Sequence, residues 1–167
     1  MLNMKSKVHI KKVESYSIYK IELFIREALS IIDKTESLFS PGQNVLLKPN
    51  LLRGFSPEHC VTTHPKVVEA MCRVLKDYSI GQITISDSPA LGSLQAVASK
   101  AGYDYLKSKY GVKIKPLTNP VAFYNNEGIS HLKIAGCLKE FDHIINMPKV
   151  KSHCQMGMTL AIKNLFG

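Results

Sequence analysis

The sequence predicts an α/β domain in which a mostly parallel or mixed sheet is flanked by helices. Short apolar runs typical of buried strands occupy residues 45–47, 83–85 and 143–146. Segments with apolar residues at helical spacing lie between these runs. Each run also ends in a polar cluster that contains proline. Strands that alternate with helices in this way favour a largely parallel sheet.

The N-terminal part predicts a strand, a helix and the first buried strand. Apolar and polar residues alternate over 8–13, which is typical of a strand at a sheet edge. Apolar residues then recur every three or four positions over 18–32, and Ser17 stands in the N-cap position of that helix. Turn residues at 40–44 lead into the strand at 45–47.

The rest of the chain continues the alternation. His64-Pro65 marks the start of a helix, because proline is favoured in the first helical turn. Gly102 stops a later helix. The elements expected after the helix at Pro65 are a strand at 83–85, a helix at 92–100, short strands at 112–114 and 129–134, a strand at 143–146 and a final helix at 156–166.

Length and composition predict one globular domain over residues 1–167. The chain is 45% hydrophobic and 21% charged, which is close to globular averages. It contains no apolar run of the length that crosses a membrane, and its first ten residues lack the apolar stretch of a signal peptide. We therefore expect a cytoplasmic protein that does not enter a membrane.

The charge points to an anionic partner. The 22 basic and 13 acidic residues give a net charge of +9. Nucleic-acid readers rely on arginine for bidentate contacts with bases, and only Arg26, Arg53 and Arg73 are present. The lysines are also scattered rather than grouped in a run. The pattern therefore disfavours nucleic acid and favours a small anionic ligand.

The cysteines and histidines predict no metal site in this chain. None of the four cysteines forms a Cys-x-x-Cys pair, so neither an iron–sulfur nor a zinc-ribbon site is expected. His59, Cys60 and His64 lie close in sequence, but their spacing matches no standard metal site. We expect no cofactor bound by these residues.

The polar clusters after the three buried strands predict a binding site. Because the strands are expected to be parallel, all three clusters should lie at one edge of the sheet. Ligands of open parallel sheets bind at this edge, outside the carboxyl ends of the strands. Cations beside a carboxylate and a hydroxyl suit a carboxylate or phosphate ligand. The expected substrate-binding residues are Lys48, Asn50, Ser88, Lys149 and Lys151. Each cluster also has a plain structural reading, as a turn, a helix cap or surface charge.

Three further residues are candidates for catalysis. His153 precedes the final segment and is expected to act as general acid or base. Asp87 would orient a partner or take part in proton transfer. Lys163 follows a small, apolar segment, where a lowered pKa would make its amine a nucleophile. The alternative for Lys163 is a lysine that complements a helix dipole.

These motifs together resemble the family called domain of unknown function 362. The stretches that carry the resemblance are 45–52, 62–68, 87–89, 142–153 and 161–167. Many members of that family carry a segment that binds a four-iron four-sulfur cluster, and members continue beyond the Asn-Leu-Phe-Gly motif. The resemblance therefore implies an incomplete version of a larger domain, the N-terminal part of a longer protein. A cluster would lie in a missing C-terminal segment or a partner.

His153 and Lys163 also resemble a pair in the N-terminal domain of nickel-pincer lactate racemase. In that family a histidine is followed ten residues later by a lysine, across a segment rich in small residues. The histidine transfers protons and the lysine carries the cofactor. The resemblance implies a reactive His/Lys pair here, without nickel or racemisation.

Several functions stay open at this point. The leading hypothesis is part of a cytoplasmic enzyme that binds a small anionic substrate and is linked to redox chemistry through the missing segment. The alternatives are a truncated fragment without catalytic activity and a basic module that binds nucleic acid. An exposed apolar patch near the C-terminus would favour a homodimer or docking of the missing half.

Overall fold

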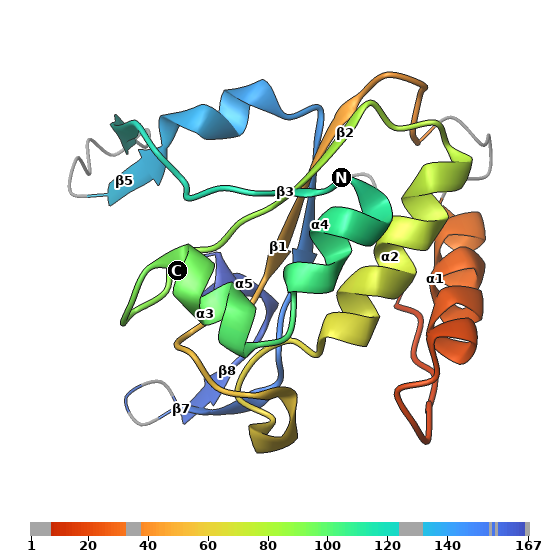
Figure 1. The fold of residues 1–167 in the computed structure, drawn as a ribbon, viewed down its shortest axis with the longest axis horizontal. Coiled ribbons are helices and arrows are strands. Elements are labelled where there is room, and N and C mark those ends of the chain that lie inside the picture. The colour runs from red at the N-terminus through yellow and green to blue at the C-terminus, as the bar shows by residue number, and fades with distance from the viewer. Residues whose placement is uncertain (1–7, 33–37, 124–131, 154, 156, 166–167) are drawn as a thin grey trace, which may run out of the picture.

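A four-stranded parallel sheet forms the centre of the molecule (Figure 1). The computed structural model describes residues 8–32, 38–123, 132–153, 155 and 157–165. The strand order in the sheet is β3-β2-β1-β6, and every neighbouring pair is parallel. The strands of this sheet are β1 (Asn44–Pro49), β2 (Gln82–Ile85), β3 (Lys113–Ile114) and β6 (His143–Met147).

Helices and two small antiparallel sheets surround the central sheet. The small sheets pair β4 (Pro120–Phe123) with β5 (Leu132–Ala135), and β7 (Lys151–His153) with β8 (Gly157–Thr159). The helices are α1 (Ile18–Ile32), η1 (Pro57–His59), α2 (Pro65–Asp77), α3 (Leu94–Lys100), α4 (Asp104–Tyr110), η2 (Gly136–Glu140) and α5 (Ala161–Asn164).

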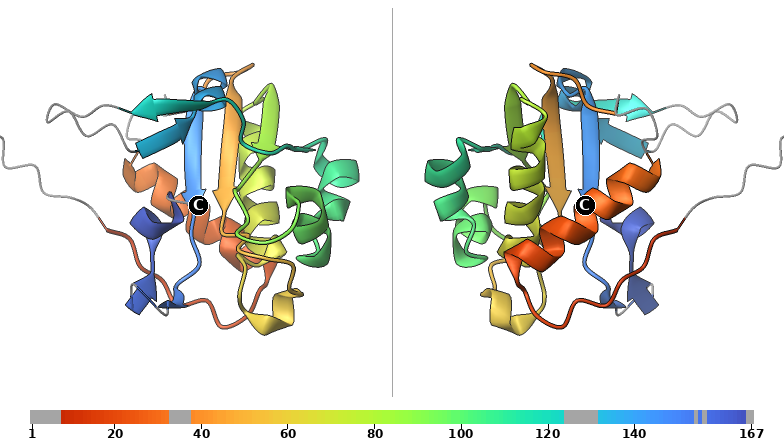
Figure 2. Two further views of the ribbon diagram at one scale, coloured as in Figure 1. Left: turned by 90° about the vertical axis from the view of Figure 1, so that its left-hand side faces the viewer. Right: turned by 90° about the vertical axis from the view of Figure 1, so that its right-hand side faces the viewer.

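Helices α1 and α2 cover one face of the sheet. In the right-hand view of Figure 2, α1 crosses in front of the strands. Its buried residues, Ile21 and Ile25, are one turn apart, so one stripe of the helix faces inward. Helix α2 begins as the sequence predicts, with Pro65 in its first turn, and the His64 side chain accepts a hydrogen bond from the Lys66 N–H at 3.2 Å.

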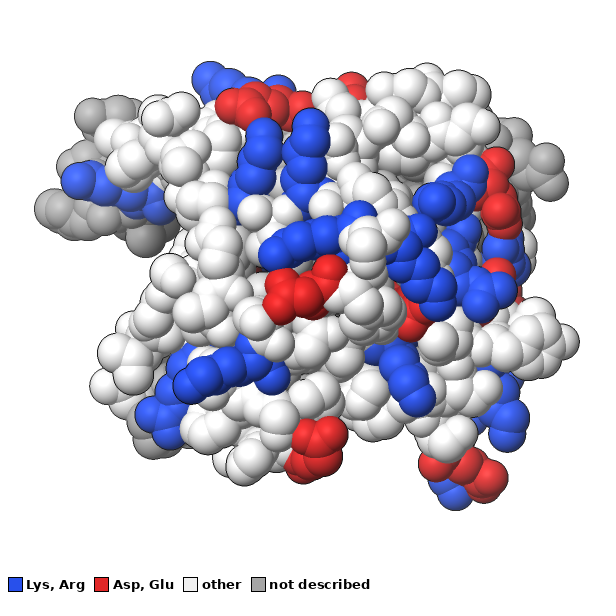
Figure 3. Space-filling view, viewed as in Figure 1, with Lys and Arg blue, Asp and Glu red and all other residues white. Residues whose placement is uncertain are grey.

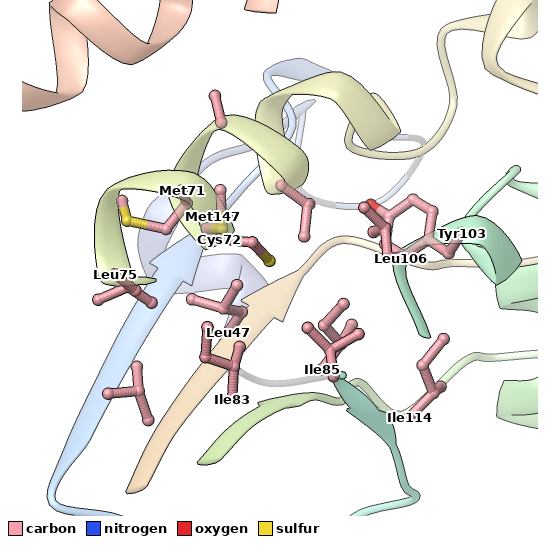
Figure 4. Packing of buried hydrophobic residues seen from close by; sticks show 14 of the residues in the cluster. Leu47, Met71, Cys72, Leu75, Ile83, Ile85, Tyr103, Leu106, Ile114 and Met147 are labelled. Carbon is pink, nitrogen blue, oxygen red and sulfur yellow. The ribbon is translucent and has the colours of Figure 1, made fainter. Parts of the chain in front are cut away.

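The main hydrophobic core lies between this helical layer and the sheet (Figure 4). Leu47 and Ile85 are fully buried at the carboxyl ends of neighbouring strands and sit opposite each other in the register. Val68 and Leu75 of α2 are also fully buried and close the core from the helical side. Each Å² of apolar surface that is buried contributes about 25 cal/mol to stability, so this layer is the main source of stability.

Helix α5 lies on the other face of the sheet. Alternate residues of a strand point to opposite faces. Leu47 belongs to the core beneath α2, whereas Lys48 reaches α5 and donates to the Asn164 carbonyl at 2.7 Å. Figure 1 shows α5 and α2 on opposite sides of β1. Helix α5 therefore lies on the face of the sheet opposite the main core.

The central expectation, a parallel sheet flanked by helices, is confirmed. The three buried strands, β2, β1 and β6, lie side by side and parallel in one sheet. Ser17 caps α1 as expected, with its hydroxyl 3.5 Å from the Lys20 N–H. The strand expected at 112–114 joins the main sheet as β3. The strand expected at 129–134 is in part confirmed as β5, which pairs with β4 outside the main sheet; residues 129–131 lie outside the described residues.

Two predicted elements are wrong, and one helix was missed. Residues 8–13 form no strand; Val8 and Ile10 are 78% and 86% exposed and have no partner strand. The helix predicted at 156–166 is wrong over residues 157–165, which form β8 and the four-residue α5. Gly157 takes a left-handed conformation (φ +71°) and Leu160 is extended (φ −136°, ψ −167°), and neither conformation is helical. Residues 156 and 166 lie outside the described residues. Helix α4 was missed because it has a single buried residue, Leu106.

Candidate functional site

A cleft of about 840 Å³ lies at the carboxyl ends of β1 and β2 and beside the segment that follows β6. Three loops line it: the one after β1, the one after β2, and the stretch from β7 to α5. In the strand order β3-β2-β1-β6, β2 and β3 lie on one side of β1 and β6 lies on the other, so the strand order reverses between β1 and β6. This is the topological switch point, where open α/β sheets bind their ligands.

A buried ion pair forms the floor of the cleft. Lys48 and Asp87, both 4% exposed, face each other with Nζ and Oδ1 at 2.5 Å. The second carboxylate oxygen of Asp87 accepts the Leu51 backbone N–H at 2.7 Å. A buried charge requires such compensation, because an unpaired one is strongly unfavourable in a low-dielectric interior. The pair therefore ties the ends of β1 and β2 together and leaves Asp87 with little uncompensated charge.

The side chain of Asn164 joins the third element to this floor. It is 2% exposed, and its amide donates to the Lys48 carbonyl at 3.1 Å and to Asn146 Oδ1 at 2.8 Å. Its Oδ1 accepts from the Asn50 amide at 2.9 Å. Each polar group of this buried amide thus has a partner, which is what allows it to be buried. The network holds α5 against the ends of β1 and β6.

Lys151 closes one side of the cleft. Its ammonium donates to Asn50 Oδ1 at 2.8 Å and to the Val61 carbonyl at 2.7 Å. Burial lowers the pKa of Lys151, because desolvation disfavours its charged form, although the nearby Asp87 carboxylate acts in the opposite direction. Lys151 is therefore half-buried and oriented by neutral oxygens.

Cations outnumber carboxylates around the cleft. Arg53, Lys151 and Lys163 line it together with one carboxylate, Asp87, which already pairs with Lys48. Among the described residues, no carboxylate forms an ion pair with Arg53, Lys151 or Lys163. Basic side chains also predominate over the rest of the face seen in Figure 3, with acidic ones between them. The cleft thus has a net positive charge that its own side chains do not neutralise.

Planar groups flank one of these cations, Arg53. The Arg53 guanidinium lies over the Phe55 ring, 4.7 Å from its centroid, and the Phe55 and His59 rings are 5.4 Å apart. The His59 Nδ1 is 3.0 Å from the Ser56 hydroxyl. Arginine stacked on an aromatic face keeps its N–H groups available in the guanidinium plane.

Most of the residues predicted for the site do come together. Asn50, Asp87, Ser88, Lys151, His153 and Lys163 all line the cleft. His153 and Lys163 reach it from β7 and α5, separated by a hairpin, and the His153 Nδ1 accepts the Gln155 N–H at 3.2 Å. Lys48 lies beneath the cleft in its ion pair. Lys149 is not among the lining residues, and its ammonium is 3.5 Å from the Tyr16 hydroxyl.

Sequence reasoning missed three residues of the site. Asn164 and Asn146 supply the amides that join α5 to β6 and β1. Asn146 is a single polar residue within an apolar stretch, which is a signal that could have marked it, whereas Asn164 directly follows Lys163 and carries no such signal. Arg53, one of three arginines in the chain, follows the first buried strand by a few residues and could have been added to the first polar cluster.

The histidines and cysteines near the cleft do not converge. His59 and Cys60 line it, whereas His64 caps α2 and stacks on Tyr16, with ring centroids 3.6 Å apart. Within the described parts of the chain, no three His, Cys, Asp or Glu side chains gather closely enough to hold a metal ion. Within the same residues, none of the helices has the length and apolar character of a membrane-spanning helix.

Comparisons with known proteins place this chain in a family. The thylakoid-associated protein sll1697 of Synechocystis sp. (strain ATCC 27184 / PCC 6803 / Kazusa) is 33% identical over 164 residues, which cover 98% of this chain and 51% of that protein. The chain thus spans about half the length of this curated relative. No solved structure gives a significant match. The sequence pattern of one family matches residues 45–167, which include the entire cleft. The chain therefore belongs to the family described as domain of unknown function (DUF362).

Proposed function

We propose that the switch-point cleft binds a small anionic ligand and that this domain is the substrate-binding part of an enzyme. The observation that carries the proposal is the charge of the cleft: Arg53, Lys151 and Lys163 line it, while Asp87 is compensated from below by Lys48. A carboxylate or phosphate would supply the missing negative charge through charge-assisted hydrogen bonds. Lys48 then acts on the ligand indirectly, by holding Asp87.

In this proposal His153 and Lys163 are the reactive groups. Both side chains line the cleft. The Asn164 network fixes α5, which carries Lys163, and the hydrogen bonds of Lys151 hold β7, which carries His153. An imidazole can accept a proton on one ring nitrogen and donate one from the other, so His153 is suited to give or take a proton from a bound ligand. Lys163 supplies an amine at the same site. The resemblance of this pair to the one in nickel-pincer lactate racemase stays a prediction.

The test is binding of citrate and pyrophosphate, two small multivalent anions, measured by isothermal titration calorimetry. Lys163→Gln is expected to weaken binding by about tenfold, because one charge-assisted hydrogen bond contributes roughly 1.5 kcal/mol or more. Lys139→Gln removes the same charge from the exposed helix η2, outside the cleft, and should leave affinity unchanged. Equal losses in both variants, or no binding to the unaltered protein, would refute the proposal.

We also propose that the C-terminal part of the described chain contacts another polypeptide. Six large apolar side chains there are between 45% and 75% exposed, and apolar patches of this kind are typical of interfaces. The relative extends for about as much again as the matched region, which supports docking of a corresponding second half; in isolation, a second copy would cover the patch. The six residues are Ile144, Val150, Met158, Leu160, Ile162 and Leu165.

The location and the redox link stay predictions. The name of the relative ties that protein to thylakoids, so attachment to a membrane surface is the competing expectation to a cytoplasmic location. A four-iron four-sulfur cluster in a further segment or partner is tested by iron and sulfide analysis of protein purified from its host without oxygen.

A further inference from the structure

The cleft has an apolar side as well as a cationic one. Leu52 and Leu91 both line it and are 38% and 66% exposed. The two loops that carry them are tied together, because the Ala90 N–H donates to the Leu52 carbonyl at 2.9 Å. The free energy falls when an apolar group covers leucines that are held in this exposed position. An inorganic anion would leave them in water.

One cation of the cleft, Arg53, stands next to a flat surface. Arg53 is stacked on Phe55 and lines the same cleft as Leu52 and Leu91. A guanidinium in this position can pair with an anion through its edge, while its face and the neighbouring rings accept a planar group. The arrangement therefore suits one molecule that carries both features.

The size of the cleft favours a larger ligand over a simple anion. Clefts of 300–1,000 Å³ are about the size that holds drug-sized organic molecules. The 840 Å³ found here exceeds by far what a phosphate or an acetate ion fills. Most of this volume would hold water unless the ligand had a body beyond its charged group.

We propose, resting on the function proposed above, that the ligand is an amphiphilic organic anion: a carboxylate or phosphate joined to a planar apolar body. The charged group lies against Lys151, Lys163 and the edge of Arg53. The apolar body lies over Leu52 and Leu91. Specificity then comes from the presence of both parts in one molecule.

Three probes test this assignment: naphthoate, which has both parts, naphthalenemethanol, which lacks the charge, and acetate, which lacks the ring. Their dissociation constants are measured with the 167-residue chain by calorimetry or by naphthalene fluorescence. Naphthoate is expected to bind at least about tenfold more tightly than either partial probe, because apolar burial and ion pairing each contribute on the order of one tenfold step.

Two leucine variants locate the apolar contact. Leu91→Ser is expected to weaken naphthoate binding by about fivefold and leave citrate binding unchanged. Leu23→Ser is the matched control, because Leu23 is 44% exposed on α1 and does not line the cleft. Both positions are exposed, so neither change is expected to unfold the protein.

The outcomes distinguish the amphiphilic ligand from the anion-binding function on which it rests. If citrate and pyrophosphate bind but naphthoate binds no better than acetate, the amphiphilic ligand is refuted and the anion-binding function stands. If naphthalenemethanol binds as tightly as naphthoate, the charged part of the assignment is wrong. If none of the anions binds, both proposals fail.

Discussion

The buried pair Lys48–Asp87 allows the sharpest test of how the cleft is built. Asp87→Asn keeps the shape of the side chain and the oxygen that accepts the Leu51 N–H, but it removes the charge. Lys48 is 4% exposed, so its ammonium would be left buried with one neutral partner, the Asn164 carbonyl. Breaking a buried pair from one side destabilises proteins by about 3–5 kcal/mol. We expect a loss of that size in the free energy of unfolding.

The measurement is urea unfolding followed by far-ultraviolet circular dichroism. Asp104→Asn breaks the exposed pair with Lys107 and serves as control, with an expected loss below about 0.5 kcal/mol. The double variant Lys48→Met/Asp87→Leu removes both charges and should recover most of the stability. A loss below about 1 kcal/mol for Asp87→Asn, or no recovery in the double variant, would show that this ion pair does not hold the cleft together.

Three further results are expected. Asn164→Ala should lower the free energy of unfolding by on the order of 2–4 kcal/mol in the same urea assay, because it leaves several buried partners unsatisfied; a loss no larger than that of Asp104→Asn would contradict the network. Burial alone raises the pKa of Glu69, but hydrogen bonds, led by the one from Lys109, outweigh burial and lower the pKa. The stability that results is present above pH about 4.5 and is lost as the pH falls through the folded-state pKa. This pH-dependent loss should be missing in Glu69→Gln when urea unfolding is compared across pH 6 to 2. Ile162→Glu should shift the isolated chain from dimer to monomer in light scattering, whereas Ile32→Glu, at a similarly exposed site on α1, should not.

The strand ends were predictable because their signals are local. A short apolar run followed by proline and polar residues indicates where a buried strand stops, and three such runs in a parallel sheet place their ends together. This reasoning brought Asn50, Asp87, Lys151 and His153 to one cleft. It required no knowledge of strand order.

The interior of the site was not predictable in the same way. Whether a lysine at a strand end faces a ligand or a carboxylate depends on which residue sits beside it across the sheet, and Lys48 and Asp87 are 39 positions apart. Asn164 lies 114 positions from Asn50 in the sequence. The final segment was predicted as one helix that ends before Gly167, and the sequence does not show that Gly157 takes a left-handed conformation and turns the chain between β7 and β8.

The most direct test of the central claim is to locate the bound anion. The measurement is a two-dimensional ¹H–¹⁵N NMR titration of the chain with pyrophosphate at fixed ionic strength. We predict that the amide signals that move at the lowest concentration belong to the cleft, at Asn50, Ser88, His153 and Lys163, and that Lys163→Gln weakens the response. Small shifts spread over exposed lysines such as Lys139, with no saturation and no response to Lys163→Gln, would show that the cleft is not an anion site.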